Sequence, residues 1–244
     1  ITKTYKDMTQ TVYFVSLGAG DPELITLKAL RLLERADVIY SPVSLSPNGR
    51  RASKSKSIML SLGIKEEQIV SYDMPVNRER EGAEDAYKQV AEDIKARRQA
   101  NGDLIAAVVA IGDAGFYASS AYIGELLEAE NIPTCYLPGV PALIASNALI
   151  GGQLVQLDEQ LRVIPGVATP SEWEEAWQSK HTIVIMKGSM AEEEIKRAMK
   201  SYPHRHWHYL EYVGYEGKEL YLNDVNQIAE RKFPYFSLII SKTR

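Results

Sequence analysis

Cysteine is almost absent from this chain of 244 residues, in which Cys135 is the only one. A single thiol excludes an intrachain disulfide and any metal site built from several cysteines, and it favours, weakly, a reducing compartment. The run around it, residues 134–137, predicts a buried strand, so we interpret Cys135 as a small core residue. We expect a cytoplasmic protein without a bound metal ion.

Long hydrophobic runs are missing as well. No apolar stretch reaches the roughly 18 residues that a transmembrane helix needs, and the polar segment 1–10 has no signal-peptide core. We therefore expect no membrane partner. Met8 directly precedes the first predicted strand and is a candidate native start, in which case residues 1–7 are an addition or the end of an upstream fusion partner.

The chain also lacks a surplus of basic residues. Lysine and arginine number 28 against 32 aspartates and glutamates, for a net charge of −4. This balance argues against a general basic surface, so we expect no nucleic-acid partner. With 45% apolar residues, the chain is long enough for one large domain or two of about 100–150 residues.

Strand and helix patterns alternate over the first 150 residues, which favours right-handed parallel β-α-β units. The predicted strands are 11–17, 38–40 (stopped by Pro42), 69–72, 104–111 and 134–137, and the predicted helices are 24–35, 83–98 and 119–130, with a polar loop at 44–55.

The second half has a mixed pattern. The predicted strands are 161–164, 182–186, 208–213, 218–221 and 235–240, and the predicted helices are 171–178, with Ser171 as its N-cap, and 191–200. Two of the last three strands are close enough in sequence for a hairpin or a meander. The sequence thus predicts two α/β domains, 9–151 and 152–244, with a mainly parallel N-terminal sheet and a mixed C-terminal sheet.

The segment Gly18-Ala19-Gly20-Asp21-Pro22-Glu23 joins a predicted strand to a predicted helix. It lacks the third glycine of a dinucleotide fingerprint, because Glu23 stands in that place and would repel a pyrophosphate. No Gly-Lys-Ser/Thr follows, which excludes a P-loop. A tight turn explains the two glycines but not the sequence that follows them.

Four segments in order carry a resemblance to the tetrapyrrole methylases. They are G-A-G-D-P-E-L-I-T-L-K-A (18–29) with A-D-V-I-Y (36–40), A-I-G-D-A-G-F-Y (110–117), L-P-G-V-P-A (137–142) and I-V-I-M-K-G (183–188). Three further features are similar to the members that methylate carbon 20 of precorrin-2 or cobalt-factor II: Ser41-Pro42 and residues 157–166 and 235–240.

The resemblance implies a methyltransferase that binds S-adenosylmethionine (SAM) in a cleft between its two domains and releases S-adenosylhomocysteine. It implies cofactor contacts from Ala19, Ile111, Gly112, Asp113, Phe116, Pro141, Ala142 and Met186. A tetrapyrrole substrate carries many carboxylates, and the basic residues Arg50, Arg51, Lys54 and Lys56 are candidates to bind them. Homodimers are common in the family.

No catalytic residue is identified by the sequence. Transfer from a sulfonium to an electron-rich carbon needs placement more than acid–base help, and Asp21, Tyr117 and Glu211 are candidates for shaping the site or accepting a proton. His204, His206 and His208 alternate as on one face of a strand; we favour a solvent-facing strand edge over a metal site.

The chain also departs from the family pattern. The usual opening is Gly-x-Gly-Pro-Gly-Asp-Pro, where this chain has Ser16 for the first glycine and Ala19 for the proline. Ala114 replaces the proline of Gly-Asp-Pro, and Pro141 replaces a serine or threonine. These changes leave open two alternatives: transfer to another ring carbon or to a non-tetrapyrrole acceptor such as a modified protein histidine, or a degenerate binding protein without activity.

Overall fold

The computed structural model describes residues 10–45, 51–74 and 81–243. The chain divides into two compact units, Ile1–Pro141 and Ala142–Arg244. The domain boundary expected at Gly151–Gly152 falls inside the second unit, where Gly151 ends a short helix, α7 (Asn147–Ile150), in the left-handed conformation at φ 74°. Glycine is common both at helix ends and in linkers, so the Gly151-Gly152 pair alone does not distinguish the two.

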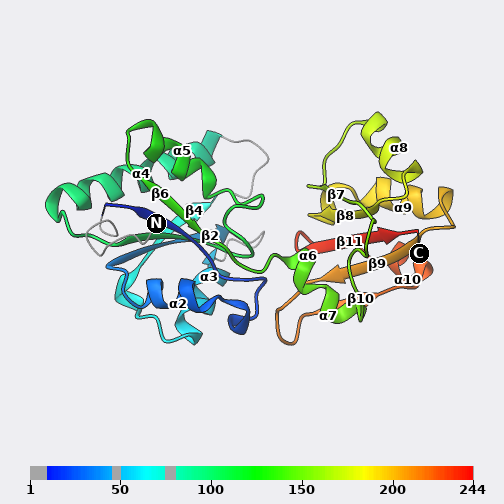
Figure 1. Ribbon diagram of the computed structural model, residues 1–244, viewed down its shortest axis with the longest axis horizontal. Coiled ribbons are helices and arrows are strands. Elements are labelled where there is room, and N and C mark those ends of the chain that lie inside the picture. Colours follow the sequence, from blue (N-terminus) through cyan, green and yellow to red (C-terminus); the bar gives the residue numbers. More distant parts are fainter. Residues whose placement is uncertain (1–9, 46–50, 75–80, 244) are drawn as a thin grey trace. The chain divides into compact units, whose positions relative to one another are not determined.

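The first unit is built on a mainly parallel sheet, as predicted (Figure 1). Strands β2, β5, β1 and β6 lie side by side in this order, and β3 and β4 both pair with β2. All pairs are parallel except β2 with β3. The elements are β1 (Val12–Ser16), η1 (Pro22–Leu24), α2 (Leu27–Leu33), β2 (Val38–Leu45), β3 (Arg51–Ala52), α3 (Lys54–Ser61), η2 (Glu66–Gln68), β4 (Ile69–Met74), α4 (Glu81–Ala100), β5 (Ala106–Ala110), α5 (Ala121–Ala129) and β6 (Thr134–Leu137).

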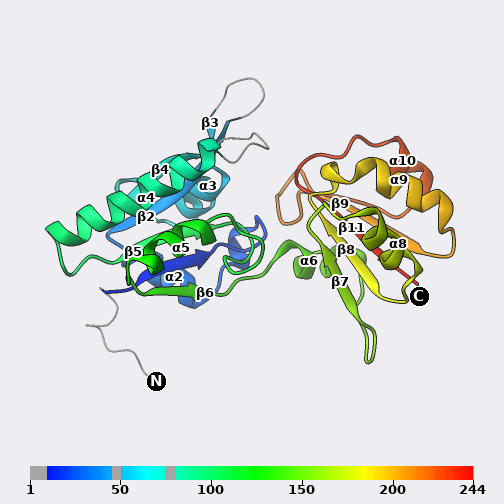
Figure 2. The same cartoon turned by 90° about the horizontal axis from the view of Figure 1, so that it is seen from above.

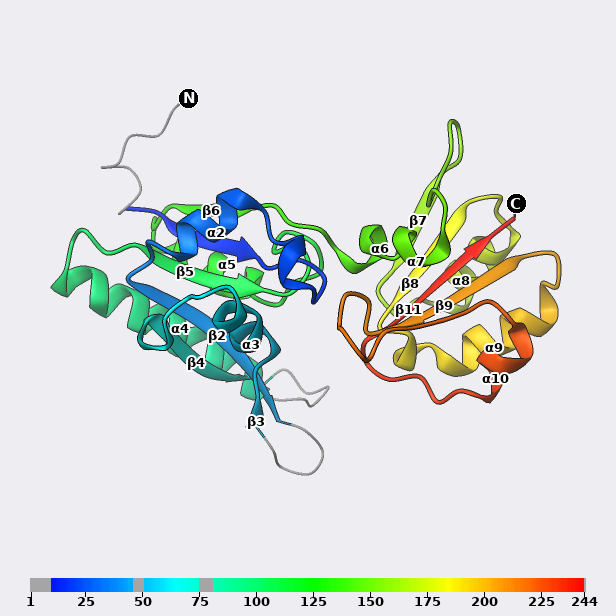
Figure 3. The ribbon, with the colours of Figure 1, turned by 90° about the horizontal axis from the view of Figure 1, so that it is seen from below.

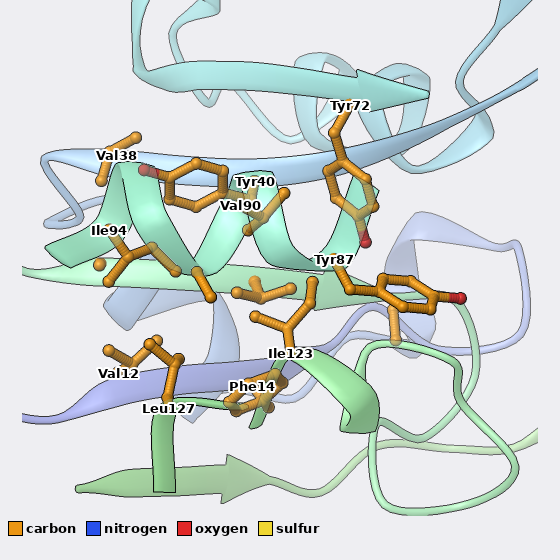
Figure 4. Close-up of a cluster of buried hydrophobic side chains, with 14 of the residues drawn as sticks. Val12, Phe14, Val38, Tyr40, Tyr72, Tyr87, Val90, Ile94, Ile123 and Leu127 are labelled. Carbon is orange, nitrogen blue, oxygen red and sulfur yellow. The ribbon is translucent and has the colours of Figure 1, made fainter. Parts of the chain in front are cut away.

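Alternate residues of the buried strands face opposite layers of helices. Val12 and Phe14 of β1 join the core under α4 and α5, which contains Tyr87, Ile94 and Ile123 (Figure 4). The intervening residues Tyr13 and Val15 pack instead with α2 and α3. Burial on both faces explains the continuous apolar run of β5, in which Val108 and Val109 each contribute roughly 1.5–3 kcal/mol when removed from water.

Two predictions around β2 are wrong. Pro42 does not end the strand: β5 pairs only with Val38–Tyr40, so beyond Tyr40 the strand has one parallel neighbour, β4, and tolerates a residue without an N–H. The segment 44–55 is not simply a polar loop, since Ser44 and Leu45 pair with Ala52 and Arg51 in an antiparallel ladder.

The second unit has a mixed five-stranded sheet, as predicted, in the order β10-β9-β11-β8-β7. Figures 2 and 3 show the four strands from β9 to β7, and Figure 1 labels β10. Only β7 and β8 pair in parallel. Helices α8, α9 and α10 cover one face through Trp173, Trp177, Ile195 and Ile228. The elements are α6 (Ala142–Ala145), α7, β7 (Leu161–Ile164), α8 (Pro170–Gln178), β8 (Thr182–Met186), η3 (Gly188–Met190), α9 (Glu192–Ser201), β9 (His206–Glu211), β10 (Leu220–Leu222), α10 (Val225–Glu230) and β11 (Ser237–Lys242).

Antiparallel pairing of β9 with β10 confirms the expected hairpin. The expected N-cap at Ser171 is wrong, because Thr169 caps α8 in a reciprocal capping box with Glu172 and Pro170 occupies the first turn. β9 lies between β10 and β11 and is not the expected strand edge. None of the helices in the described part of the chain is long and apolar enough to cross a membrane.

Candidate functional site

Three loops meet at the carboxyl ends of the adjacent strands β5, β1 and β6, the edge at which parallel sheets bind ligands. The loop after β1 and the loop after β5 are joined by a two-way backbone contact. The Gly112 N–H donates to the Gly18 carbonyl at 2.6 Å, and the Gly18 N–H donates to the Gly112 carbonyl at 3.2 Å. Both glycines have φ near +80°, which explains why the sequence has glycine there.

Asp113 joins the loop after β5 to the loop after β6. One carboxylate oxygen accepts the Gly115 N–H at 2.8 Å, and the other accepts the Gly139 N–H at 2.7 Å. The side chain is only half-buried, so it combines a charge at the surface with fixed geometry. Charge-assisted bonds of this kind are among the stronger hydrogen bonds in proteins.

Ser16, the last residue of β1, forms a second tie between the same loops. Its hydroxyl donates to the Leu137 carbonyl at 2.6 Å and accepts the Ala114 N–H at 2.8 Å. Ser16 is completely buried, and Ala114 is 1% exposed. The sequence flagged both residues only as departures from a pattern and did not indicate that they touch.

Close packing explains the glycine at position 139 and leaves space beside Gly112. A side chain on Gly139 would lie 2.4 Å from the Ser16 Cβ and 2.8 Å from the Gly112 carbonyl oxygen. A Cβ on Gly112 would meet only the Pro141 Cα, at 3.9 Å. Gly112 and Pro141, both predicted cofactor residues, therefore border one small space, whereas Gly139 has none.

Phe116 and Tyr117 form an aromatic pair at the end of the loop that follows β5. Their rings meet edge to face with centroids 4.8 Å apart. Tyr117 has φ 52°, unusual for a residue with a side chain, and is 49% exposed. Strained backbone next to a ligand-binding edge favours a functional role for this residue.

The remaining predicted residues of the β1 loop have local roles. Ala19 is 2% exposed, so its side chain packs inside the loop. Asp21 caps η1 by accepting the Glu23 N–H at 2.8 Å. Asp21 thus acts as a hydrogen-bond acceptor for the backbone of its own loop.

Ala142 and Met186 belong to the second unit. Ala142 begins α6, and Met186 is the half-buried last residue of β8, paired in register with Leu238. The following residue, Lys187, has φ 53°.

Glu211, a candidate base, is occupied. Its carboxylate accepts the Tyr209 hydroxyl at 2.5 Å and the Arg231 guanidinium at 2.7 Å, and it is 5% exposed. Burial, together with this hydrogen bond to Glu211, raises the pKa of Tyr209 far above its usual value. The group is an ion pair between a buried carboxylate and a partly exposed guanidinium, and it joins β9 to the end of α10.

The predicted basic cluster is partly ordered by secondary structure. Arg51 pairs with Asp73 at 2.5 Å, Lys56 pairs with Glu66 at 2.7 Å, and Lys54 is the first residue of α3. Three serine hydroxyls under this helix contact one another: Ser41 lies 3.0 Å from Ser53 and 2.8 Å from Ser55. Arg50 lies outside the described residues.

The alternating histidines do not gather. His204 precedes β9, His206 is exposed, and His208 is half-buried with its Nδ1 2.8 Å from the Tyr221 hydroxyl. Within residues 10–45, 51–74 and 81–243, no group of three or more His, Cys, Asp or Glu side chains is arranged to hold a metal ion.

The amino-acid sequence of this chain is similar to those of known methyltransferases. A probable cobalt-precorrin-2 C(20)-methyltransferase of Methanocaldococcus jannaschii is 29% identical over 74% of this chain and 73% of its own length. A precorrin-2 C(20)-methyltransferase of Sinorhizobium sp. is 29% identical over 93% of this chain and 92% of its own length.

Solved structures share the fold. A cobalt precorrin-4 methyltransferase superposes with a TM-score of 0.71 at 16% identity, covering 99% of this chain and 98% of its own. Uroporphyrin-III C-methyltransferase from Thermus thermophilus, complexed with S-adenosylhomocysteine, superposes with a TM-score of 0.65 at 20% identity, covering 95% and 97%. The family model of the tetrapyrrole (corrin/porphyrin) methylases matches residues 11–229, and the chain belongs to this family.

Proposed function

We propose that this chain is a SAM-dependent methyltransferase that methylates carbon 20 of precorrin-2 or cobalt-factor II, or of a closely similar tetrapyrrole, in cobalamin biosynthesis. The observation that carries the proposal is the joining of three glycine-containing loops at one sheet edge by Asp113, Ser16 and the Gly18–Gly112 contact. Family membership and two relatives named for methylation at this carbon support the substrate.

The chemistry of this edge fits SAM. The methionine end of SAM carries an ammonium and a carboxylate, and the half-buried Asp113 offers a fixed carboxylate for the first of these. The space between Gly112 and Pro141, which no side chain of residue 112 fills, suits close approach of a ligand to the backbone. We propose Ala19, Ile111 and Phe116 as further contacts, and Ala142 and Met186 on the resemblance alone.

The protein's task in this reaction is placement. Bound SAM supplies a methyl group on a sulfonium, which is a good leaving group. The loop ties hold the backbone of residues 112–116 in one conformation, and such pre-organisation is worth several kcal/mol when reacting atoms must be aligned. The exposed Tyr117, with its hydroxyl and its strained backbone, is the candidate to contact the substrate. Asp21 is proposed only to shape the loop.

Recognition of the substrate carboxylates is proposed for Arg51, Lys54 and Lys56, together with Arg50. Arg51 and Asp73 form an exposed ion pair, and the partly buried Lys56 pairs with the exposed Glu66; solvent screens such surface pairs, so they exchange partners readily. A polyanionic substrate can therefore replace Asp73 and Glu66 at low cost. We further propose a cytoplasmic homodimer with no nucleic-acid partner.

Mass spectrometry of precorrin-2 and cobalt-factor II incubated with the protein and methyl-labelled SAM tests the proposal. One labelled methyl group at carbon 20 is the expected product. Labelling at another carbon would assign a different transfer within the family. Calorimetry with SAM and S-adenosylhomocysteine accompanies the assay, and the absence of binding at sub-millimolar ligand would overturn the proposal in favour of a degenerate binding protein.

A further inference from the structure

We infer that Ser16 is a positioning residue for the cofactor loop and that it forms a matched pair with Ala114. The Ser16 hydroxyl accepts the Ala114 N–H at 2.8 Å and donates to the Leu137 carbonyl at 2.6 Å. One buried hydroxyl thus connects the ends of β1 and β6 to the loop after β5. The inference rests on the proposed function for its cofactor-binding readout, but not for the coupling itself.

The two residues explain each other chemically. Where the family pattern has glycine at the position of Ser16 and proline at that of Ala114, neither a hydroxyl nor an N–H is present. Alanine at position 114 brings back an N–H that is buried, and a buried donor without an acceptor is costly. The Ser16 oxygen is that acceptor, so the two departures act as one exchange.

The exchange replaces one source of rigidity by another. Proline would restrict the loop through its ring, whereas here two hydrogen bonds through one hydroxyl restrict it. The neighbouring Asp113 reaches Gly139 on the same β6 loop that Leu137 begins. The Ser16 tie and the Asp113 tie therefore hold the same pair of loops at consecutive residues.

Ser16 lies where β1 and the β6 loop approach each other closely. Its Cβ lies 2.4 Å from where a Gly139 side chain would begin, so the close approach of β1 to the β6 loop leaves no room for a side chain on residue 139. The hydroxyl has two protein partners and no exposed surface, which fixes its direction.

A double-mutant cycle tests the pair: wild type, Ser16→Gly, Ala114→Pro and the double variant Ser16→Gly/Ala114→Pro. We expect each single variant to bind SAM at least tenfold more weakly, because one buried group loses its partner or the proline ring meets the hydroxyl. The double variant should return to within about threefold of wild type. KM for SAM should follow the same order, whereas KM for the macrocycle should change less than twofold.

Ser241→Ala is the matched control. Ser241 is also fully buried in a strand, where its hydroxyl accepts from Arg205 at 2.8 Å, but it lies in the second unit. This variant should lower the unfolding midpoint in urea without changing SAM affinity. Equal losses of SAM affinity in Ser241→Ala and Ser16→Gly would mean that general destabilisation, not the loop tie, explains the result, and would overturn the inference.

Urea unfolding of the four proteins separates the inference from the proposed function. If wild type does not bind SAM, the proposed function fails, but the unfolding midpoints still report the coupling. Recovery of the midpoint in the double variant, including recovery from single variants that fail to fold, supports the pair. Additive losses in both binding and unfolding, or a double variant that does not fold, overturn it.

Discussion

The carboxylate of Asp113 accepts a hydrogen bond from the backbone N–H of Gly139 at 2.7 Å, across 26 positions of sequence. The same side chain accepts the N–H of Gly115, two residues away. Asp113 is therefore both the charge proposed to meet the cofactor and the brace that sets the distance between two loops. Substitutions at this residue test both roles, because Asp113→Asn removes the charge and one of the two acceptors.

Asp113→Asn keeps one oxygen acceptor, but its amide nitrogen cannot accept an N–H. We expect SAM affinity to fall at least tenfold in Asp113→Asn and to be lost at sub-millimolar ligand in Asp113→Ala, as measured by calorimetry. Asp224→Asn and Asp224→Ala are the controls, because Asp224 likewise accepts two backbone N–H groups, those of Asn226 and Gln227, at the start of α10. Asp224→Ala should cost about 1 kcal/mol of stability and leave SAM affinity unchanged.

Unchanged SAM affinity in Asp113→Asn, with folding intact, would contradict the proposed cofactor role. Loss of affinity only in Asp113→Ala would assign the residue to loop bracing rather than to a charge contact.

The ion pair of Glu211 and Arg231 should matter for stability rather than for proton transfer. The Glu211 side chain is 7% exposed and that of Arg231 is 42% exposed, so the two ends of the pair are not equivalent. Arg231→Met leaves a buried carboxylate without its cation and should cost about 3–5 kcal/mol, whereas Glu211→Gln leaves a cation that water can reach and should cost about 1–3 kcal/mol. Urea unfolding of both variants and of the double variant measures this order.

Activity of Glu211→Gln provides the second readout. If Glu211 accepted a proton during the reaction, its loss should lower kcat by about a hundredfold or more. We expect a change of less than tenfold at temperatures well below unfolding. A larger fall in kcat, with wild-type SAM affinity, would indicate that Glu211 accepts a proton in the reaction.

Elements with strong apolar periodicity could be predicted from the sequence, and those defined by long-range pairing could not. β7 and β8 were predicted at their observed bounds, 161–164 and 182–186, because each is a short apolar run between turn signals. The sequence does not predict helix α3 (residues 54–61), the start of which falls in the predicted loop 44–55, because that start depends on Ser53 as a cap and on the distant Ser41, which contacts it. The short helices α6, α7 and α10 lack a full apolar repeat, so local sequence does not indicate them.

The candidate site shows the same division. Motif resemblance indicated Gly112, Asp113 and Pro141, which the structure places around one sheet edge. In the sequence, Ser16 is visible only as a departure from the family pattern, since nothing there says that residues 16, 114 and 137 meet. A serine where glycine is usual, in the same chain as an alanine where proline is usual, was the signal available. Its meaning depends on the register of β1 between β5 and β6.

His208 should make the protein less stable in mild acid. Burial, and then the charges of Lys242 and His206, lower the pKa of this imidazole below its ordinary value of 6.5. The unfolded chain therefore binds a proton on His208 at a higher pH than the folded chain does. The contribution of the neutral His208 to folding stability is present above about pH 6.5 and is lost as the pH falls below that value. Urea unfolding from pH 5 to pH 8 should show a smaller loss in His208→Gln than in wild type.

The exposed His204 gives the control for this experiment. His204→Gln removes an exposed imidazole and leaves the half-buried His208 in place, so it shows how much of any change comes from losing a histidine at the surface. An identical slope for His208→Gln and wild type would show that other groups account for the acid sensitivity.

Arg51 should contribute to macrocycle binding without contributing to SAM binding. Its guanidinium is 2.5 Å from Asp73 with both side chains more than half exposed, so the pair is weak and solvent-screened. Arg51→Gln should raise KM for the tetrapyrrole about three- to tenfold at low salt, with SAM affinity unchanged. Asp73→Asn should lower KM for the tetrapyrrole, because it removes the carboxylate that competes with the substrate for this cation.

Arg97→Gln is the matched control, since Arg97 is a half-exposed arginine of the same unit that pairs with Asp93 at 2.9 Å. Raising the salt concentration should reduce the difference between wild type and Arg51→Gln, because screening weakens exposed charge contacts. If Arg97→Gln raises KM as much as Arg51→Gln does, the effect comes from net charge, and the basic cluster is not the carboxylate site. Opposite effects of Arg51→Gln and Asp73→Asn on KM, with Arg97→Gln unchanged, place the substrate carboxylates at the end of β2.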